Sequence, residues 1–546
     1  MQEQLPRLKY LLNGLTSFPD QEDRLITGLT LDSREVVCGD AFIALAGAKQ
    51  HGLAHVEQAI NNGACAVIFD PAGDGRQLAD IVGANSSASG AQVNPPLQIP
   101  MIAVDNLSLK LGELAARFYG DPSRFMAVIG ITGTNGKTSC SQFLSQVLDD
   151  CGIIGTLGWG EWGKLNKTLN TTPDALAIQK ILAELLKDKK CAVAMEVSSH
   201  GLEQGRVNGV RFKGAVFTNI SRDHLDYHGT MDAYVQAKLA LLKTPGLAFA
   251  VVNLDDAYSG QIIASVPEAV QLWQFSANGK TADSGECVSA ENIVHKTDGI
   301  EFDLRWQDQL QRVKVPLYGD FNVENVLAVL TVMLAIGVPL HDDCMDAGGT
   351  TPRTGEVEQR MERLPRATHG AVAEAAKRLS RIKPVDGRME RFGAETDPLV
   401  FVDYAHTPDA LDKVLSSLRK HCKQALWVVF GCGGNRDAGK RPQMGKIAEQ
   451  WADHVVITDD NPRYENGLDI VNEILAGCRS AKVEVIQNRE QAIQKVITQA
   501  AANDYVVIAG KGHEQYQEIN GVQLPFSDRQ VVMEALDRRR FKVQGE

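Results

Sequence analysis

Continuous apolar runs of four to seven residues recur along this chain and alternate with helix-like segments. Runs that are apolar at every position, rather than at alternate positions, are typical of strands covered on both faces of a parallel sheet. A longer run at 326–340 predicts a buried helix, because it is too short and too limited by Gly and Pro to cross a bilayer. The chain is therefore expected to be an α/β protein. The predicted strands lie at 41–45, 64–69, 125–129, 191–197, 214–220, 399–402, 426–430, 454–457 and 505–509.

The chain of 546 residues is long enough for three or four domains. We expect a small α/β domain at 1–105, a second domain at 106–340 and a doubly wound C-terminal domain at 374–546. Within the first domain, 83–96 is rich in Gly, Ser, Ala, Asn and Pro and predicts a loop. The segment 341–373 is dense in Arg and Glu with little apolar periodicity, so it is expected to be a surface insertion or linker.

A glycine-rich loop directly follows the predicted strand 125–129 and precedes a helix-like segment, 139–148. Glycines let backbone N–H groups approach a polyphosphate, and a helix N-terminus adds partial positive charge. Lys137 would neutralise the β- and γ-phosphates, and the Thr138 hydroxyl would hold Mg²⁺. The strict pattern has glycine where this chain has Ile131, and the alternative is a turn that merely ends the strand. The loop comprises Gly133, Thr134, Asn135, Gly136, Lys137, Thr138 and Ser139.

Further polar residues follow the next two predicted strands. Glu196 ends one strand, His224 comes shortly after the next, and Lys238 follows on the helix-like segment 231–243. In open α/β sheets, ligands bind where such strands end. Thr138, Glu196 and His224 are therefore candidate metal ligands near a triphosphate. They are far apart in sequence, so the alternative of separate, hydrogen-bonded structural residues stays open.

The net charge of −12 and the pI near 5.6 argue against a nucleic-acid partner, so local basic groups must hold any anionic ligand. The N-terminal residues lack the basic and apolar regions of a signal peptide. Ten cysteines without a Cys-x-x-Cys pair indicate reduced thiols in a cytosolic protein. We expect a cytoplasmic monomer without membrane insertion.

Six motifs along the chain together resemble the Mur ligase family, whose members form amide bonds with ATP in cytoplasmic peptidoglycan synthesis. The resemblance covers nearly the whole chain except 341–373. It implies a UDP-sugar-binding N-terminal domain, a central P-loop parallel-sheet ATPase domain and a Rossmann-like C-terminal domain that binds an amino acid. The motifs are 133–138 (GTNGKT), 196–200 (EVSSH), 222–229 (RDHLDYHG), 322–325 (NVEN), 387–390 (GRME) and 403–408 (DYAHTP).

Within the family, the chain resembles the members that add meso-2,6-diaminopimelate to UDP-N-acetylmuramoyl-L-alanyl-D-glutamate. The reaction implied is phosphorylation of the D-glutamate γ-carboxylate by ATP, followed by attack of the incoming amine on the acyl phosphate. The resemblance assigns Lys137 and Thr138 to the phosphates and a first Mg²⁺. It assigns Glu196, His224 and Lys238 to a second Mg²⁺, with Lys238 carbamylated, whereas the alternative is that Lys238 is a surface lysine.

The resemblance also implies substrate contacts. Asn322 and Asn325 match positions that face the adenine, and Arg388 and Asp403 match nucleotide contacts from the third domain, which implies domain closure over ATP. The match at 48–50 is the loosest. The expected UDP-sugar side comprises Leu31, Ser33, Ala48, Lys49, Gln50, Asn170, Thr171, Thr172, Ser198, Gln204 and Arg206.

Amino-acid selection has its own motif. The stretch 460–463 resembles the family's signature for diaminopimelate, although such a stretch can also be an ordinary Asx/Pro turn. Guanidinium groups bind carboxylates bidentately, so two arginines and one glutamate suit a zwitterionic side-chain end and suit lysine poorly. Asn435 stands where the family usually has Asp. The implied set is Arg436, Asp460, Asn461, Pro462 and Arg463 for the carboxylates, with Gly510 and Glu514 for the distal ammonium.

Two other classes of function stay open at this point. Folylpolyglutamate synthase shares the nucleotide-binding core and forms an amide to glutamate, but it gives no reason for a UDP-type N-terminal domain. A degenerate, non-enzymatic nucleotide-binding module should have lost Lys137, Glu196, His224 or Lys238, and all four are present.

Overall fold

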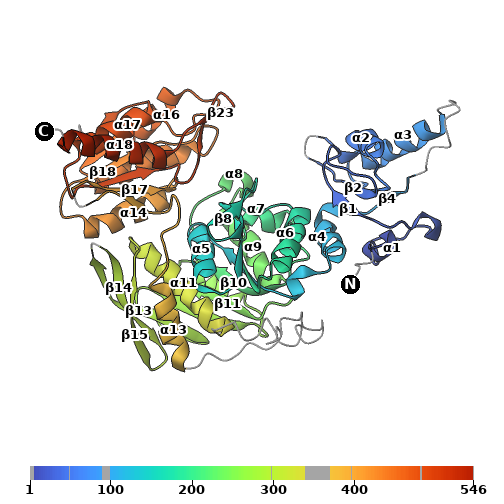
Figure 1. Cartoon of the computed structure of the whole chain (residues 1–546), viewed down its shortest axis with the longest axis horizontal. Coiled ribbons are helices and arrows are strands. Elements are labelled where there is room, and N and C mark those ends of the chain that lie inside the picture. Colours follow the sequence, from blue (N-terminus) through green and yellow to red (C-terminus); the bar gives the residue numbers. More distant parts are fainter. Residues whose placement is uncertain are drawn as a thin grey trace.

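The computed structural model describes residues 5–47, 50–88, 99–296, 298–337, 369–394, 396–479 and 483–544. Three large sheets follow one another along the chain, each with helices packed on it, so the α/β prediction is confirmed. In Figure 1 the N-terminal unit lies at one end of the molecule, the central unit in the middle, and the C-terminal unit above the central one.

The N-terminal unit has four parallel strands in the order β1-β2-β3-β4. Every residue of β2 and β3 is buried, as their continuous apolar runs predict. Helix α3 continues to Ala88, so 83–88 is helical where a loop was expected; Ala and Ser cost little in a helix. The elements are α1 (Leu8–Leu11), β1 (Gly28–Thr30), β2 (Asp40–Ala44), α2 (Val56–Asn61), β3 (Ala66–Phe69), α3 (Gly75–Ala88), β4 (Met101–Ala103) and α4 (Leu107–Phe118).

The central unit has one sheet in the order β15-β14-β13-β12-β11-β10-β5-β9-β6-β7-β8. Its strands pair in parallel from β13 to β6 and antiparallel at both flanks. Strand β5 lies between β10 and β9, where Ile131 pairs with Glu196 and Thr132 pairs with Phe217. The carboxyl ends of these three strands therefore meet at one edge. The strands are β5 (Ala127–Thr132), β6 (Cys151–Gly155), β7 (Gly158–Glu161), β8 (Lys164–Asn166), β9 (Ala192–Glu196), β10 (Phe212–Phe217), β11 (Phe249–Asn253), β12 (Gln271–Ser276), β13 (Glu286–Lys296), β14 (Gly299–Trp306) and β15 (Gln309–Val315).

Helices cover both faces of this sheet (Figure 1). The buried helix predicted from the apolar run at 326–340 is α11, which begins earlier, at Asp320, and is buried along most of its length. The helices of this unit are α5 (Lys137–Val147), α6 (Ala175–Lys187), α7 (Ser199–Glu203), α8 (Leu225–His228), α9 (Met231–Leu239), α10 (Ser259–Ala264), α11 (Asp320–Ile336) and α13 (His369–Leu379).

Helix α13 corrects the expected boundary of the C-terminal domain. Its residues Ala371, Val372, Ala375 and Leu379 belong to the same hydrophobic core as α11 and the central sheet. The start expected at 374 therefore falls inside a helix of the central unit. Residues 369–373 are helical rather than part of a surface insertion, because small apolar residues form one buried stripe among the charged ones. The rest of the expected insertion, up to 368, lies outside the described residues.

The C-terminal unit has a main sheet of six strands in the order β16-β17-β21-β18-β19-β20, parallel except for β16, and a separate β22-β23 hairpin. The carboxyl ends of β17, β18, β19 and β21 carry the polar turns noted in the sequence. The elements are β16 (Glu390–Phe392), β17 (Leu399–Asp403), α14 (Pro408–His421), β18 (Leu426–Phe430), α15 (Arg441–Trp451), β19 (His454–Ile457), α16 (Gly467–Leu475), β20 (Val483–Val485), α17 (Arg489–Gln499), β21 (Tyr505–Ala509), β22 (Tyr516–Ile519), β23 (Val522–Pro525) and α18 (Asp528–Gln544).

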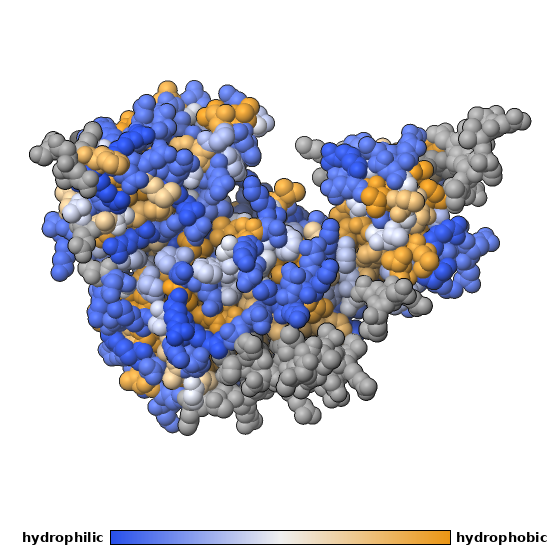
Figure 2. All heavy atoms as spheres, in the orientation of Figure 1, coloured by the Kyte–Doolittle hydropathy of each residue, from blue (hydrophilic) through white to orange (hydrophobic). Residues whose placement is uncertain are grey.

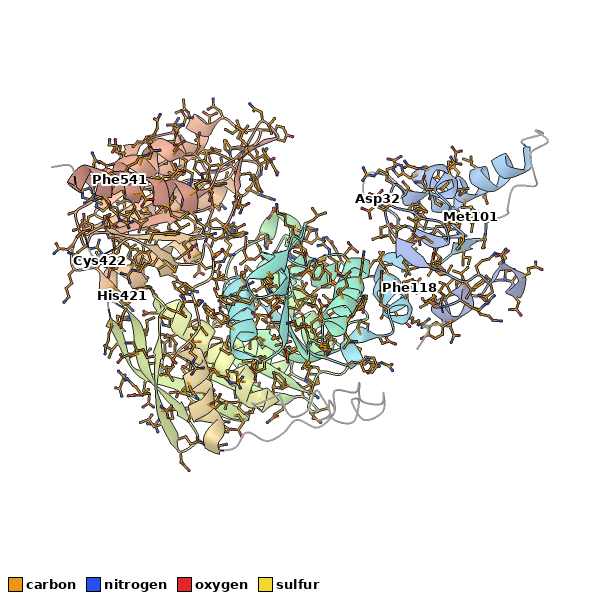
Figure 3. All side chains as sticks on the ribbon, in the orientation of Figure 1. Asp32, Met101, Phe118, His421, Cys422 and Phe541 are labelled. Atoms are coloured by element: carbon orange, nitrogen blue, oxygen red, sulfur yellow. The ribbon has the colours of Figure 1, made fainter. Side chains whose placement is uncertain are left out.

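Helix α14 attaches the C-terminal unit to the central unit at both of its ends. In its first turn, Asp409 accepts hydrogen bonds from Asn135 Nδ2 (3.1 Å) and Ser221 Oγ (3.2 Å). At its last turn, Lys420 pairs with Asp320 of α11. Figure 3 labels His421 on the side of the C-terminal unit that faces β13 and β14. The edge that carries the glycine loop is thereby brought against the C-terminal unit.

The N-terminal unit joins the central one through α4, which packs on α6. Figure 2 shows a hollow between the N-terminal and C-terminal units, above the central unit. Among the described helices, none is both long and apolar enough to cross a membrane.

Candidate active site

The glycine loop between β5 and α5 depends on two glycines in conformations that other residues rarely adopt. Gly133 has φ +146° and Gly136 has φ +87°. A Cβ at Gly136 would lie only 2.5 Å from Asn325 Oδ1, so an alanine there would require the loop or the Asn325 side chain to shift. The loop leads into α5, whose first N–H groups and dipole favour a phosphate.

Two ammonium groups contact this loop, one half-buried and one buried. Lys137 Nζ donates to the carbonyl oxygens of Gly133 (2.8 Å) and Thr134 (2.9 Å). Lys238 Nζ, from α9, donates to the Gly133 carbonyl at 2.9 Å, and its residue is 1% exposed. Burial lowers the pKa of both ammonium groups, and the nearby Lys137 lowers that of Lys238 further, to well below its usual range. Lys238 is therefore not a surface lysine.

Glu196, at the end of β9, places a fully buried carboxylate beside the loop. Its Oε2 accepts hydrogen bonds from the hydroxyls of Thr138 and Thr156, both at 2.9 Å, and its Oε1 accepts one from the Thr156 amide at 3.0 Å. These donors are neutral, and a buried charge that is hydrogen-bonded but not ion-paired is costly. A divalent cation next to Thr138 would offset that charge, and hydroxyl and carboxylate oxygens are the ligands that Mg²⁺ prefers.

His224 lies farther out, with its ring 4.8 Å from the ring of His200 and its Nε2 3.5 Å from Asp223 Oδ2. Burial lowers the pKa of its imidazole, which favours the neutral form that binds metals. Within the described ranges, no three His, Cys, Asp or Glu side chains form a group that could hold a metal. The second metal site expected from the sequence would thus need the carbamate on Lys238 in addition to Glu196 and His224.

A cavity of about 240 Å³ lies between the loop and the C-terminal unit. Asn325 lines it, whereas Asn322 lies behind: the Asn325 amide donates to Asn322 Oδ1 at 3.1 Å, and Asn322 in turn donates to the Tyr318 carbonyl. Asn322 therefore orients Asn325 and does not itself line the cavity. The predicted nucleotide residues on its wall are Thr134, Asn135, Gly136, Lys137, Thr138, Ser139, Asn325, Arg388 and Asp403.

Arg388 and Asp403 bring the C-terminal unit to the phosphate loop. The Arg388 guanidinium stacks 4.3 Å from the Tyr404 ring centroid, and its Nη2 lies 3.4 Å from Thr138 Oγ1. Asp403 accepts hydrogen bonds from the amides of Met389 (2.7 Å) and Ala405 (2.8 Å). Burial raises the pKa of the Asp403 carboxyl, and the charge of Arg388 opposes that rise.

A second cavity, of about 620 Å³, adjoins the first, because Thr171, Asp223 and His224 line both. Gln204 lies outside this lining and accepts a hydrogen bond from Arg206 Nε at 3.0 Å, so it holds Arg206 in place. From the expected UDP-sugar side, the wall contains Asn170, Thr171, Thr172, Ser198 and Arg206.

The other residues expected on the UDP-sugar side belong to the N-terminal unit and line neither cavity. Ser33 is buried and donates to Gln58 Oε1 at 2.8 Å, Leu31 is half-buried, and Gln50 is exposed. Ala48 and Lys49 lie outside the described residues. Figure 3 labels the neighbouring Asp32 on the edge of this unit that faces the other two units.

The far end of the second cavity is lined by Arg436, Asp460, Asn461, Arg463, Gly510 and Glu514. Arg463 adopts φ +53°, with Nε 3.2 Å from Glu518 Oε2 and Nη1 donating to the Gly434 carbonyl at 2.8 Å. Pro462 does not line the cavity. Two guanidinium groups and two carboxylates thus face one space from three different turns, which exceeds what an ordinary turn at 460–463 would assemble.

Asn435 connects this end of the site to the neighbouring turn. Its side-chain oxygen accepts a hydrogen bond from the Tyr464 amide at 3.1 Å, and its left-handed φ of +52° is one that Asn tolerates. This bond fixes the backbone that precedes Arg436.

Sequence reasoning missed Lys511, Asp223 and His406. Lys511 is 0% exposed beneath the second cavity, whereas Asp223 and His406 line both cavities. All three lie within motifs already singled out. Burial distinguishes Lys511 from its neighbours, whereas a place on the walls of both cavities distinguishes Asp223 and His406.

Family models match three parts of the chain: "Mur ligase family, catalytic domain" at 25–119, "Mur ligase middle domain" at 131–333 and "Mur ligase, glutamate ligase domain" at 387–512. Together these matches cover well over half of the chain. The chain belongs to the Mur ligase family.

Among its relatives, the UDP-N-acetylmuramoyl-L-alanyl-D-glutamate–2,6-diaminopimelate ligase of Pseudomonas aeruginosa is 45% identical, over 94% of this chain and 95% of that protein. The ligase of the same name from Alkalilimnicola ehrlichii is 42% identical, over 97% and 98%. A solved structure with that name is 35% identical, covers 94% of this chain and 96% of its own, and superposes with a TM-score of 0.61. Folylpolyglutamate synthase from Mycobacterium tuberculosis, at 17% identity and a TM-score of 0.56, shares the fold alone.

Proposed function

We propose that this chain uses ATP to join meso-2,6-diaminopimelate to the D-glutamate of UDP-N-acetylmuramoyl-L-alanyl-D-glutamate, a step in cytoplasmic peptidoglycan precursor synthesis. One observation carries the proposal. A phosphate-loop cavity and a larger cavity that ends in Arg436, Arg463 and Glu514 adjoin at Thr171, Asp223 and His224. A reaction that transfers phosphate to a carboxylate and then admits an amine needs the phosphate site and the amine site to lie next to each other.

The chain's own groups account for the first half-reaction. The N-terminus of α5 and Lys137 bind the terminal phosphates and stabilise the charge that spreads over them during transfer. Thr138 and Glu196 hold a Mg²⁺, which neutralises phosphate charge when bound. Arg388, stacked on Tyr404, adds a cation from the C-terminal unit at Thr138.

Lys238 is proposed to carry a carbamate that serves a second Mg²⁺ with Glu196 and His224. Carbamylation requires a neutral amine, and the strongly lowered pKa of Lys238 supports one at neutral pH. Reaction with CO₂ forms an N–C bond, releases a proton and converts a buried amine into a carboxylate.

The second half-reaction depends on the far end of the larger cavity. Arg463, with Asp460 and Asn461 of the same turn, is proposed to bind the distal carboxylate, and Arg436 to assist at the substrate's other polar groups. Glu514 and the Gly510 turn are proposed to hold the distal ammonium. The reacting amine then points back toward His224, where the acyl phosphate forms. The UDP end would extend to Leu31, Ser33 and 48–50 of the N-terminal unit. We also propose that the protein acts as a monomer.

Substrate-dependent phosphate release is the decisive experiment. Release should require ATP, the UDP-dipeptide and diaminopimelate together. Release with a folate and glutamate in their place would identify a folylpolyglutamate synthase, and nucleotide binding without release under any combination would identify a non-enzymatic module.

A further inference from the structure

A fully buried lysine lies directly beneath the amino-acid end of the larger cavity. Lys511 follows β21 in the Gly-Lys-Gly turn, and its exposed fraction is 0%. Its Nζ donates to Glu514 Oε2 at 2.8 Å and to Asn461 Oδ1 at 2.9 Å, and it lies 5.5 Å from the Tyr516 ring centroid. The ammonium is thus withdrawn from water and bonded to two residues that line the cavity, although Lys511 does not line it.

The hydrogen bonds around Lys511 fix which atoms face a ligand. Glu514 Oε2 also accepts a hydrogen bond from Asn461 Nδ2 at 2.9 Å. The described residues therefore donate two hydrogen bonds to the Glu514 carboxylate, and Oε2 accepts both. Asn461 Oδ1 accepts a second bond, from the Glu518 amide at 2.9 Å. Glu514 Oε1 is left as the oxygen for a ligand, and the Asn461 amide cannot rotate without breaking several bonds.

The charges nearby also bear on the role of Lys511. Asp460 and Glu514 both line the second cavity, so this part of its wall carries two carboxylates. Two buried arginines of the C-terminal unit pair with other carboxylates: Arg489 with Asp528 at 2.7 Å and Arg441 with Glu465 at 2.9 Å. Lys511 is therefore the cation that directly contacts Glu514 among the described residues.

We propose that Lys511 is a positioning residue for amino-acid selection: its hydrogen bond holds Glu514 turned so that one carboxylate oxygen receives the distal ammonium of the incoming amino acid. This inference rests on the proposed function. By this inference, a residue that does not line the cavity contributes to the preference for an amino acid with a second ammonium group.

The test compares two amino acids on the same sample of enzyme. meso-Diaminopimelate has the distal ammonium, whereas 2-aminopimelate keeps both carboxylates and lacks it. The ratio of their kcat/KM values does not depend on how much of the sample is folded. Lys511→Met should lower this ratio at least tenfold and leave the KM for ATP within about twofold, because a charge-assisted contact is lost only for diaminopimelate.

A double-mutant cycle asks whether Lys511 acts through Glu514. Glu514→Gln alone should lower the ratio to a similar extent, and adding Lys511→Met should lower it little further. If the two effects multiply, or if Lys511→Met keeps the wild-type ratio, the proposal is overturned. Lys495→Met, at an exposed lysine of the same unit, is the matched control and should leave the ratio unchanged.

Two further outcomes are assigned in advance. If Lys511→Met does not fold, Lys511→Gln, which still donates one hydrogen bond, should give an intermediate ratio, and a wild-type ratio there would also overturn the proposal. If the wild-type enzyme releases no phosphate with diaminopimelate, the proposed function fails instead.

Discussion

At the scale of single residues, this site is built from charges that have been withdrawn from water. Lys238, Glu196 and Lys511 are buried, Lys137 is half-buried, and each forms hydrogen bonds within the site. Removing one partner of such an arrangement leaves another charge uncompensated, so single substitutions should have large and selective effects.

Lys238→Ala should nearly abolish ligation while the fold is retained. The proposed carbamate is a metal ligand, and short carboxylic acids added to the variant should restore part of the activity by replacing it. A ¹³C carbamate signal in wild-type protein equilibrated with ¹³C-bicarbonate is the direct measurement. Lys243→Ala, at an exposed lysine just after α9, is the control. Wild-type turnover by Lys238→Ala would refute the assignment.

Arg463→Ala should raise the KM for diaminopimelate far more than the KM for ATP, since Arg463 lines only the larger cavity. Loss of a charge-assisted contact to a carboxylate costs about 2–5 kcal/mol. For the same reason lysine, which lacks the distal carboxylate, should be a very poor substrate of the wild type. Phosphate release with diaminopimelate, lysine and ornithine measures both effects. Equal rates with lysine and diaminopimelate would contradict the role of Arg463. The control is Arg538→Ala, at an exposed arginine of α18, which should change neither KM.

At the scale of elements, the strands that carry the site were predictable to within three residues at either end. Strands β18, β19 and β21 coincide with the apolar runs, and α5 begins two residues before its predicted start. The antiparallel flanks of the central sheet, including β13, β14 and β15, were not predicted. Their burial alternates along part of each strand, and such strands lack the continuous apolar run that identifies a parallel core.

Gly136→Ala tests the phosphate loop as an element. The new Cβ would meet Asn325 Oδ1 at 2.5 Å, so the loop or the adenine-side asparagine must move, and the KM for ATP should rise at least tenfold. Gly163→Ala is a matched control, because Gly163 has a similar φ of +81° and open space around its Cβ position. It should cost about 1 kcal/mol of stability from backbone strain and leave ATP binding unchanged. Isothermal titration with a non-hydrolysable ATP analogue separates the two effects, and equal affinities would contradict the close-contact argument.

At the scale of the whole molecule, the contact between the central and C-terminal units contains a half-buried histidine. The His421 ring of α14 lies 4.4 Å from His295 of β13 and 5.8 Å from Tyr318, with Asp320 and Lys420 beside it. Burial, followed by the charge of His295, lowers the pKa of His421 to about 4, although Asp320 acts in the opposite direction. The contact therefore holds His421 neutral at pH 7.

A histidine whose pKa is lower in the folded state destabilises the fold as the pH falls from about 6.5 toward 4, because the unfolded chain takes up the proton first. His421→Phe keeps an aromatic ring against Tyr318 and removes the titration. It should reduce the loss of stability between pH 7 and pH 4.5 by about 1 kcal/mol, a figure discounted for partial exposure. Thermal unfolding at both pH values measures the change. The control is His55→Phe, at an exposed histidine, which should leave the loss of stability between the two pH values unchanged. An equal loss of stability in His421→Phe and in the wild type would contradict the prediction.

Motifs with short-range geometry determined much of the site. The glycine loop, Glu196, Arg388 and the 460–463 stretch were identifiable from sequence because their chemistry requires particular residues next to a strand end. The structure brings most of them to the walls of two adjoining cavities. Asn322, Gln204 and Pro462 do not line those cavities, because motif matching identifies positions in a chain and cannot tell a residue that faces a cavity from one that supports it.

The sequence by itself determined the class of fold, the edge of each sheet that carries the polar residues, and the family to which the chain belongs. These follow from local rules: continuous apolar runs are buried on both faces, and polar turns follow them. Only the tertiary structure decided that α13 completes the central core, that the two cavities adjoin at His224, and that Lys511 lies beneath Glu514. Burial and proximity between distant segments decide these features, because the environment of a charged side chain depends on which elements pack around it.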